Sequence, residues 1–235
     1  MKIIITNINP YKEKDAIMNG ISEEGLCSFR VPGLFSPKSK FASLNNPLTI
    51  IEPVFSESKT SKHLILKEAS LLFSPMSGQL DFNYVSAVSI LLQATNNLIE
   101  DDDKALLYQD LFQAVLALKN KINPYLVTLK YLIAVMNNTG YELNVNSCIG
   151  CGGKKNIVAF SFLEGGFICK DCMKEGYKND LEIDEMKTFR NVYLHNGYAF
   201  DSHNYEQKII ISLLKKINIF ISDAYGYSIT SINNL

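Results

Sequence analysis

The stretch "SCIGCGGKKNIVAFSFLEGGFICKDC", residues 147–172, carries four of the chain's five cysteines. They form two Cys-x-x-Cys pairs, Cys148 with Cys151 and Cys169 with Cys172, separated by seventeen residues. This spacing lets both sulfurs of each turn point at one ion, and it is typical of four-cysteine zinc sites. Glycines beside both pairs supply the backbone conformations that turns around thiolates need. The segment therefore predicts a structural zinc ion with no open position for catalysis.

Two other interpretations of the cysteines stay open. They can be reduced thiols or a thiol–disulfide switch, although redox motifs use one pair at a helix start. Spacing alone also does not exclude an iron–sulfur cluster. Between the pairs, "IVAFSF" and "GGFIC" predict two short strands joined at "LEGG". A segment with so little apolar bulk cannot fold alone, so we expect the metal to fix it as a rigid projection between helices.

The whole chain has an ordinary globular composition: 235 residues, 47% hydrophobic and 20% charged, with a net charge of -1. Residues 1–80 have nine Lys/Arg and seven Asp/Glu, whereas 81–145 have four and seven, so a polyanion should prefer the N-terminal part. The opening apolar run is shorter than a signal-peptide core, and no window is long enough to span a bilayer. We therefore expect a soluble, cytoplasmic protein in which the isolated Cys27 is a small buried hydrophobe.

Residues 1–73 predict a small closed β-barrel. Apolar runs rich in Ile, Val, Leu and Phe are separated by turn residues: "MKIIITNI", "GLCSFRVPG", "LTIIEPVF" and "HLILKEASLLF". About five short strands in this length suit a barrel better than a sandwich. The stretch "GLFSPKSK" is expected to be a loop that carries Lys38 and Lys40.

From about residue 82 the apolar residues recur every three or four positions, which predicts helices. Two helices flank the "EDDD" of residues 100–103, and Asn123-Pro124 opens a third that ends before Gly140. One or two more helices follow the cysteines. The predicted class is α+β and multi-domain: a barrel over 1–77, a helical domain over 78–146 and 176–235, and an inserted zinc module over 147–175.

Several motifs, in this order, resemble the bacterial recombination mediator RecO family. The N-terminal ones are "YKEKD" at 11–15, "SEEG" at 22–25 and "VPGLFSPKSK" at 31–40. The later ones are Cys-x-x-Cys-Gly, Phe162, Gly165-Gly166 and the second Cys-x-x-Cys, followed by the closing "DAYGYSITSINNL". The resemblance spans nearly the full chain.

The resemblance implies an N-terminal OB-fold (oligonucleotide/oligosaccharide-binding) barrel, a helical domain and a zinc module. It also implies a role in recombinational DNA repair: binding single- and double-stranded DNA, annealing complementary strands, and loading recombinase onto strands coated by single-strand-binding protein. The implied partners are DNA, RecR and the C-terminal tail of single-strand-binding protein, with no membrane, in the cytoplasm near the bacterial nucleoid.

A lysine-bearing barrel also has the chemistry to track a nucleic-acid backbone, because lysines neutralise phosphates and aromatic rings stack on bases. The stacking candidates are Tyr11, Phe35 and Phe41. The candidates for phosphate contacts are Lys2, Lys12, Lys14, Arg30, Lys38, Lys40, Lys59 and Lys62. Each of these has an ordinary alternative, since exposed lysines are usually only solvated and strand phenylalanines usually pack a core.

No enzyme motif is recognisable: there is no phosphate-binding Gly-x-x-x-x-Gly-Lys loop or Gly-x-Ser-x-Gly elbow, and the three histidines lie in different segments. We therefore expect no catalysis. Leu34 and Phe35 stand where RecO proteins often have arginines, which favours an alternative in which the protein is an adaptor with weak DNA binding. In that case Lys104, Lys119 and Lys130 would rim a pocket for a partner's acidic tail. A zinc-ribbon transcription or translation factor is the third interpretation.

Overall fold

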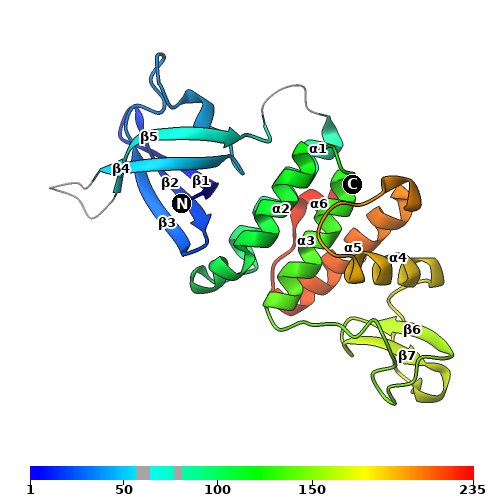
Figure 1. The fold of residues 1–235 in the computed structure, drawn as a ribbon. Helices are drawn as coiled ribbons and strands as arrows, with labels where there is room; N and C mark the ends of the chain where they lie inside the picture. The colour runs from blue at the N-terminus through cyan, green and yellow to red at the C-terminus, as the bar shows by residue number, and fades with distance from the viewer. Residues whose placement is uncertain (57–63, 77–80) are drawn as a thin grey trace. The chain divides into compact units, whose positions relative to one another are not determined.

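The computed structural model describes residues 1–56, 64–76 and 81–235 (Figure 1). The chain divides into two compact units, Met1–Asn120 and Lys121–Leu235. Within the described residues no helix is long and apolar enough to cross a membrane. The predicted domain boundary after residue 77 lies outside the described residues, and the boundaries after 146 and 175 stay predictions.

The first unit begins with a closed five-stranded barrel in the order β1-β2-β3-β5-β4, which confirms the expected barrel (Figure 1). Neighbouring strands are antiparallel except β3 and β5, which pair in parallel through Phe29↔Leu64 and Arg30↔Ile65. The strands are β1 Ile3–Tyr11, β2 Asp15–Ser22, β3 Gly25–Val31, β4 Ile50–Ser56 and β5 Leu64–Phe73.

Alternating apolar side chains fill the barrel, as strand periodicity requires. Ile3, Met18 and Phe29 are fully buried in this core. Cys27 packs against it and donates its S–H to the Gly20 carbonyl at 3.3 Å. Burial raises the pKa of Cys27 to about 11. These contacts agree with the interpretation of Cys27 as a small hydrophobe.

The first unit continues with α1 (Phe82–Asn97), the 3₁₀ helix η2 (Asp101–Leu107) and α2 (Tyr108–Lys119). The acidic run of residues 101–103 begins η2, where negative charge is favourable. Two side-chain hydrogen bonds join these helices to the barrel. Asn96 Nδ2 donates to the Thr6 carbonyl at 3.2 Å, and Gln109 Nε2 donates to Glu23 at 2.9 Å.

The second unit contains four helices and a two-stranded sheet: α3 Pro124–Asn138, β6 Ile157–Ser161, β7 Gly166–Cys169, α4 Ile183–Leu194, α5 Gln207–Tyr225 and α6 Thr230–Asn233. The predicted cap is present, because Asn123 Oδ1 accepts the N–H groups of Tyr125 and Leu126. The predicted hairpin between the cysteine pairs is the β6–β7 sheet (Figure 1).

Aromatic rings connect this hairpin to the helices. Phe160 of β6 is fully buried and meets Phe189 of α4 edge-on, with ring centroids 5.2 Å apart. Phe162 stacks on Phe220 of α5 at 5.3 Å. The hairpin therefore has more apolar bulk than the sequence interpretation allowed, and part of its order comes from packing on α4 and α5.

Candidate metal centre and nucleic-acid interface

The four predicted cysteines come together at one point. The turn at Cys148–Cys151 and the segment Cys169–Cys172, which follows β7, place all four sulfurs within 4.8 Å of one another. The Sγ atoms of Cys151 and Cys169 are 3.8 Å apart. Tetrahedral coordination with Zn–S bonds of about 2.3 Å gives sulfur–sulfur separations of about 3.8 Å. The cluster can therefore hold a metal ion, and its donor set fits zinc.

Backbone amides stabilise negative charge on one of these sulfurs. The N–H groups of Cys169 and Gly150 point at Cys148 Sγ over 3.3 and 3.4 Å. The Cys169 amide makes the largest contribution, and together such bonds lower the pKa of Cys148 to about 6. The sulfurs around Cys172, that of Cys151 first, raise its pKa to about 12. A cation at the centre is what allows all four sulfurs to ionise together.

Two glycines are required by close contacts around the cluster. At Gly166 the φ angle is +147°, and a Cβ atom would lie 2.3 Å from the Asn144 carbonyl oxygen. This approach allows Asn144 to bond both neighbours, donating to Gly165 and accepting from Phe167. At Gly150 a Cβ atom would lie 3.0 Å from Cys172 Sγ. The glycines therefore allow the backbone to wrap closely around the sulfurs.

At the barrel, Asp15 joins two parts of the predicted nucleic-acid surface. Its Oδ1 accepts the Gly33 N–H at 2.7 Å, and its Oδ2 accepts Arg30 Nη2 at 2.5 Å and Nε at 2.9 Å. The Gly33 amide, more than Arg30, lowers the pKa of Asp15. The sequence interpretation used Asp15 only as a motif residue. Asp15 lies two residues before Ile17, the cross-strand partner of Arg30, and this diagonal position becomes known only once the strand register is known.

A second bond ties the same loop to the β1–β2 turn: Phe35 N–H donates to the Lys14 carbonyl at 2.9 Å. The ammonium of Lys12 and the guanidinium of Arg30 both lie over the Tyr11 ring, 5.4 and 5.6 Å from its centroid. These contacts bring the cations of Lys12 and Arg30 to the Tyr11 ring, while Lys14 is an exposed residue of the same β1–β2 turn.

The remaining phosphate candidates are placed differently. Lys2 lies over the ring of Phe112 in α2, 5.5 Å from its centroid. Lys40 Nζ donates to the Lys67 carbonyl of β5 at 2.7 Å. Lys38 is exposed on the loop that follows β3. Two further candidates, Lys59 and Lys62, lie outside the described residues.

Two of the three stacking candidates have accessible rings, since Tyr11 is 40% and Phe35 38% exposed. The expectation for Phe41 is wrong. Its side chain is only 5% exposed and belongs to the barrel core, while Lys40 lies over its ring. Burial of an apolar ring in the core is favourable, and this is why the Phe41 side chain packs inside the barrel and is not exposed for stacking.

The lysines suggested for an acidic-tail pocket are mostly engaged. Lys104 is buried and its Nζ pairs with Asp101 at 2.5 Å. Lys130 Nζ donates to the carbonyls of Val192 and Tyr193. Lys119 lies over the Phe73 ring. The expectation that Lys104 and Lys130 offer their ammonium groups to an acidic tail is therefore wrong.

The family model described as "Recombination protein O C terminal" matches residues 79–179. A protein of Halalkalibacterium halodurans named DNA repair protein RecO is 24% identical over 175 residues, or 74% of this chain and 68% of its own. A protein of the same name from Oceanobacillus iheyensis is 23% identical over 171 residues, which is 72% of this chain and 66% of its own. Another, from Bacillus cytotoxicus, is 24% identical over 177 residues, which is 71% of this chain and 67% of its own. These matches confirm the resemblance predicted from the motifs: the chain is similar to proteins of the bacterial RecO family.

Proposed function

We propose that this protein is a non-enzymatic mediator of recombinational DNA repair that binds single- and double-stranded DNA and anneals complementary strands. With RecR it would help to load recombinase onto strands coated by single-strand-binding protein. Support for the repair role comes from relatives named DNA repair protein RecO. Support for direct DNA contact comes from one observation, the position of the Lys12 and Arg30 cations over the exposed Tyr11 ring.

The geometry suits backbone tracking better than base-specific recognition. Ammonium groups neutralise phosphates and release counterions, while a ring such as Tyr11 stacks on any base. Two strands held on such a surface repel each other less, so pairing can proceed without chemistry on the protein. The proposed site of action is the bacterial cytoplasm, near the nucleoid.

The four thiolates would hold one structural zinc ion, which fixes the two cysteine turns and leaves no position for water or substrate. In this proposal Cys148, Cys151, Cys169 and Cys172 are ligands and nothing else. The ion would supply folding free energy to the module, because the ligands lie on segments that are far apart in the unfolded chain.

Fluorescence anisotropy with a labelled single-stranded oligonucleotide tests DNA binding at several salt concentrations. We expect the affinity to fall with salt and to need no nucleotide. The double variant Lys12→Ala/Lys14→Ala should reduce the slope of log affinity against log salt by about 1.4, because each contact to a single strand contributes about 0.7. The matched control is Lys187→Ala, an exposed lysine on α4. An affinity that ignores salt, or equal slopes for all three proteins, would refute the proposal.

The adaptor alternative has a specific observation in its favour. Asp15 already neutralises Arg30, which lowers the charge that the barrel can offer to phosphates. In this alternative the protein would bind an oligonucleotide coated with single-strand-binding protein, and have little affinity for the naked strand. Comparing the two substrates at equal salt separates the proposals. Stronger binding to the naked strand would reject the adaptor role.

A further inference from the structure

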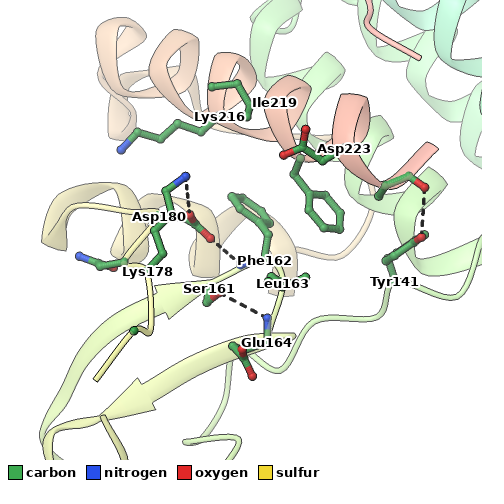
Figure 2. A pocket seen from close by; sticks show the side chains of 14 residues that line it. Tyr141, Ser161, Phe162, Leu163, Glu164, Lys178, Asp180, Lys216, Ile219 and Asp223 are labelled. Atoms are coloured by element: carbon green, nitrogen blue, oxygen red, sulfur yellow. Dashed lines mark hydrogen bonds and ion pairs between the residues drawn. The ribbon is translucent and has the colours of Figure 1, made fainter. Parts of the chain in front are cut away.

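A pocket of about 690 Å³ lies in the second unit, between the β6–β7 hairpin and α5 (Figure 2). Phe162 and Leu163 line it from the hairpin, and Ile219 and Phe220 from α5. Figure 2 labels Phe162, Leu163 and Ile219, with the hairpin below and the helix above. The volume is within the range of about 300–1,000 Å³ found for binding pockets.

The apolar part of the pocket is preformed but not covered. Phe162 stacks on Phe220, and Tyr141 meets Phe220 edge-on at 5.4 Å, so the rings hold one another in place. Leu163 is 86% exposed and Ile219 is 59% exposed. Exposed aliphatic side chains beside a rigid aromatic floor are typical of a surface that receives a partner's side chain.

The charges around the pocket are not balanced. Lys216 Nζ pairs with Glu185 at 2.5 Å, and Lys178 Nζ pairs with Asp180 at 3.8 Å. Both lysines of the pocket lining are therefore already matched by a carboxylate. The lining contains two other acidic residues.

These two acids, Glu164 at the hairpin tip and Asp223 on α5, are exposed. Among the described residues neither of them has an ion-pair partner. Figure 2 shows them on opposite walls of the pocket. The unmatched charge of this pocket is negative on both sides of an apolar centre.

We propose that this pocket binds a peptide segment of a partner protein in which a large apolar side chain neighbours a lysine or arginine. The apolar side chain would lie against Phe162 and Ile219, and the cation would lie between Glu164 and Asp223. An acidic tail is disfavoured here, because it would meet two unpaired carboxylates. All residues that line the pocket belong to the second unit and none to the barrel, so the proposal does not depend on DNA binding.

Three labelled peptides test the charge and the apolar requirement with the full chain. Ser-Leu-Lys-Phe-Arg-Ser carries both features, Ser-Leu-Glu-Phe-Asp-Ser inverts the charge, and Ser-Ser-Lys-Ser-Arg-Ser lacks the apolar groups. Fluorescence anisotropy should detect binding of the first peptide only. Stronger binding of the acidic peptide, or no binding of any peptide at millimolar protein concentration, would overturn the proposal.

Single variants locate the binding. Ile219→Ser should weaken the first peptide about tenfold, because apolar burial is lost, and Asp223→Asn about three- to fivefold. The matched controls are Ile183→Ser, 65% exposed at the start of α4, and Glu206→Gln, at the other end of α5. Equal affinities in all variants would place binding elsewhere and overturn the proposal. Concentration-dependent dimerisation abolished by Ile219→Ser would overturn it too, by assigning the pocket to a second copy.

Discussion

Replacing Gly166 by alanine should lower the unfolding free energy of the cysteine module more than a glycine-to-alanine replacement at any other position of the module. The new Cβ atom would lie 2.3 Å from the Asn144 carbonyl oxygen, which is backbone and cannot rotate away. To relieve the clash, the chain must give up the hydrogen bonds of Asn144 with Gly165, 2.8 Å, and Phe167, 3.0 Å. These are worth about 1 kcal/mol each.

The backbone conformation adds a second cost. At a φ of +147°, alanine is strained by about 1–3 kcal/mol, so the total loss of unfolding free energy is about 3–5 kcal/mol. Gly176→Ala is the matched control, because its φ is +91° but no atom lies within 4 Å of the new Cβ. The control should lose only the strain, about 1–2 kcal/mol.

Urea titrations followed by far-ultraviolet circular dichroism measure both losses, and the method suits a chain that has no tryptophan. The two hydrogen bonds should make the loss for Gly166→Ala larger than that for Gly176→Ala by about 2 kcal/mol, and this difference is the test of the contact itself. Equal losses for Gly166→Ala and Gly176→Ala would refute the reasoning. An unfolding free energy of Gly166→Ala within 1 kcal/mol of that of the parent would also refute it.

Three further predictions follow from described contacts. Cys169→Ser should release bound zinc in elemental analysis and expose the module to protease, whereas Cys27→Ser should retain the metal; retained metal in both would count against the four-thiolate site. Burial of Glu185 opposes its ionisation, but hydrogen bonds, from Lys216 first, outweigh it and hold its pKa below the usual value. Its contribution to stability is therefore full above about pH 4.3 and is lost as the pH falls through the lowered pKa, so the parent and Glu185→Gln should converge in urea titrations at low pH. Asp15→Asn should strengthen oligonucleotide binding by freeing the guanidinium it neutralises, and weaker or unchanged binding would contradict this role.

Local patterns predicted much of this fold. The barrel, the helix start at Asn123-Pro124 and the hairpin between the cysteines depend on short-range periodicity and turn residues, and all are confirmed. The sequence indicates about five strands but shows only four clear apolar runs. Strand β2, "DAIMNGIS", lies outside these runs and contains the polar Asn19 and Gly20. The structure explains that glycine: a Cβ there would lie 2.4 Å from Ile3 Cγ2, so β1 and β2 approach closely only without it.

Contacts between distant residues could not be predicted in the same way. The neutralisation of Arg30 by Asp15 and the burial of Phe41 depend on which elements become neighbours in the folded barrel unit. The pocket beside Ile219 depends on the packing of the hairpin on α5. Sequence spacing identifies the four cysteines because two Cys-x-x-Cys pairs at this separation are typical of one metal site. No comparable sequence pattern links the residues of these other contacts.

The attachment of the hairpin through Phe160 and Phe162 separates two tasks within the cysteine module. The rings seat the hairpin on α4 and α5, while the sulfurs shape only the turns at its base. Removing a bound ion should therefore loosen the turns and expose them to protease, while the hairpin stays docked. A relative that had lost its cysteines could keep the same projection, provided that it kept the rings.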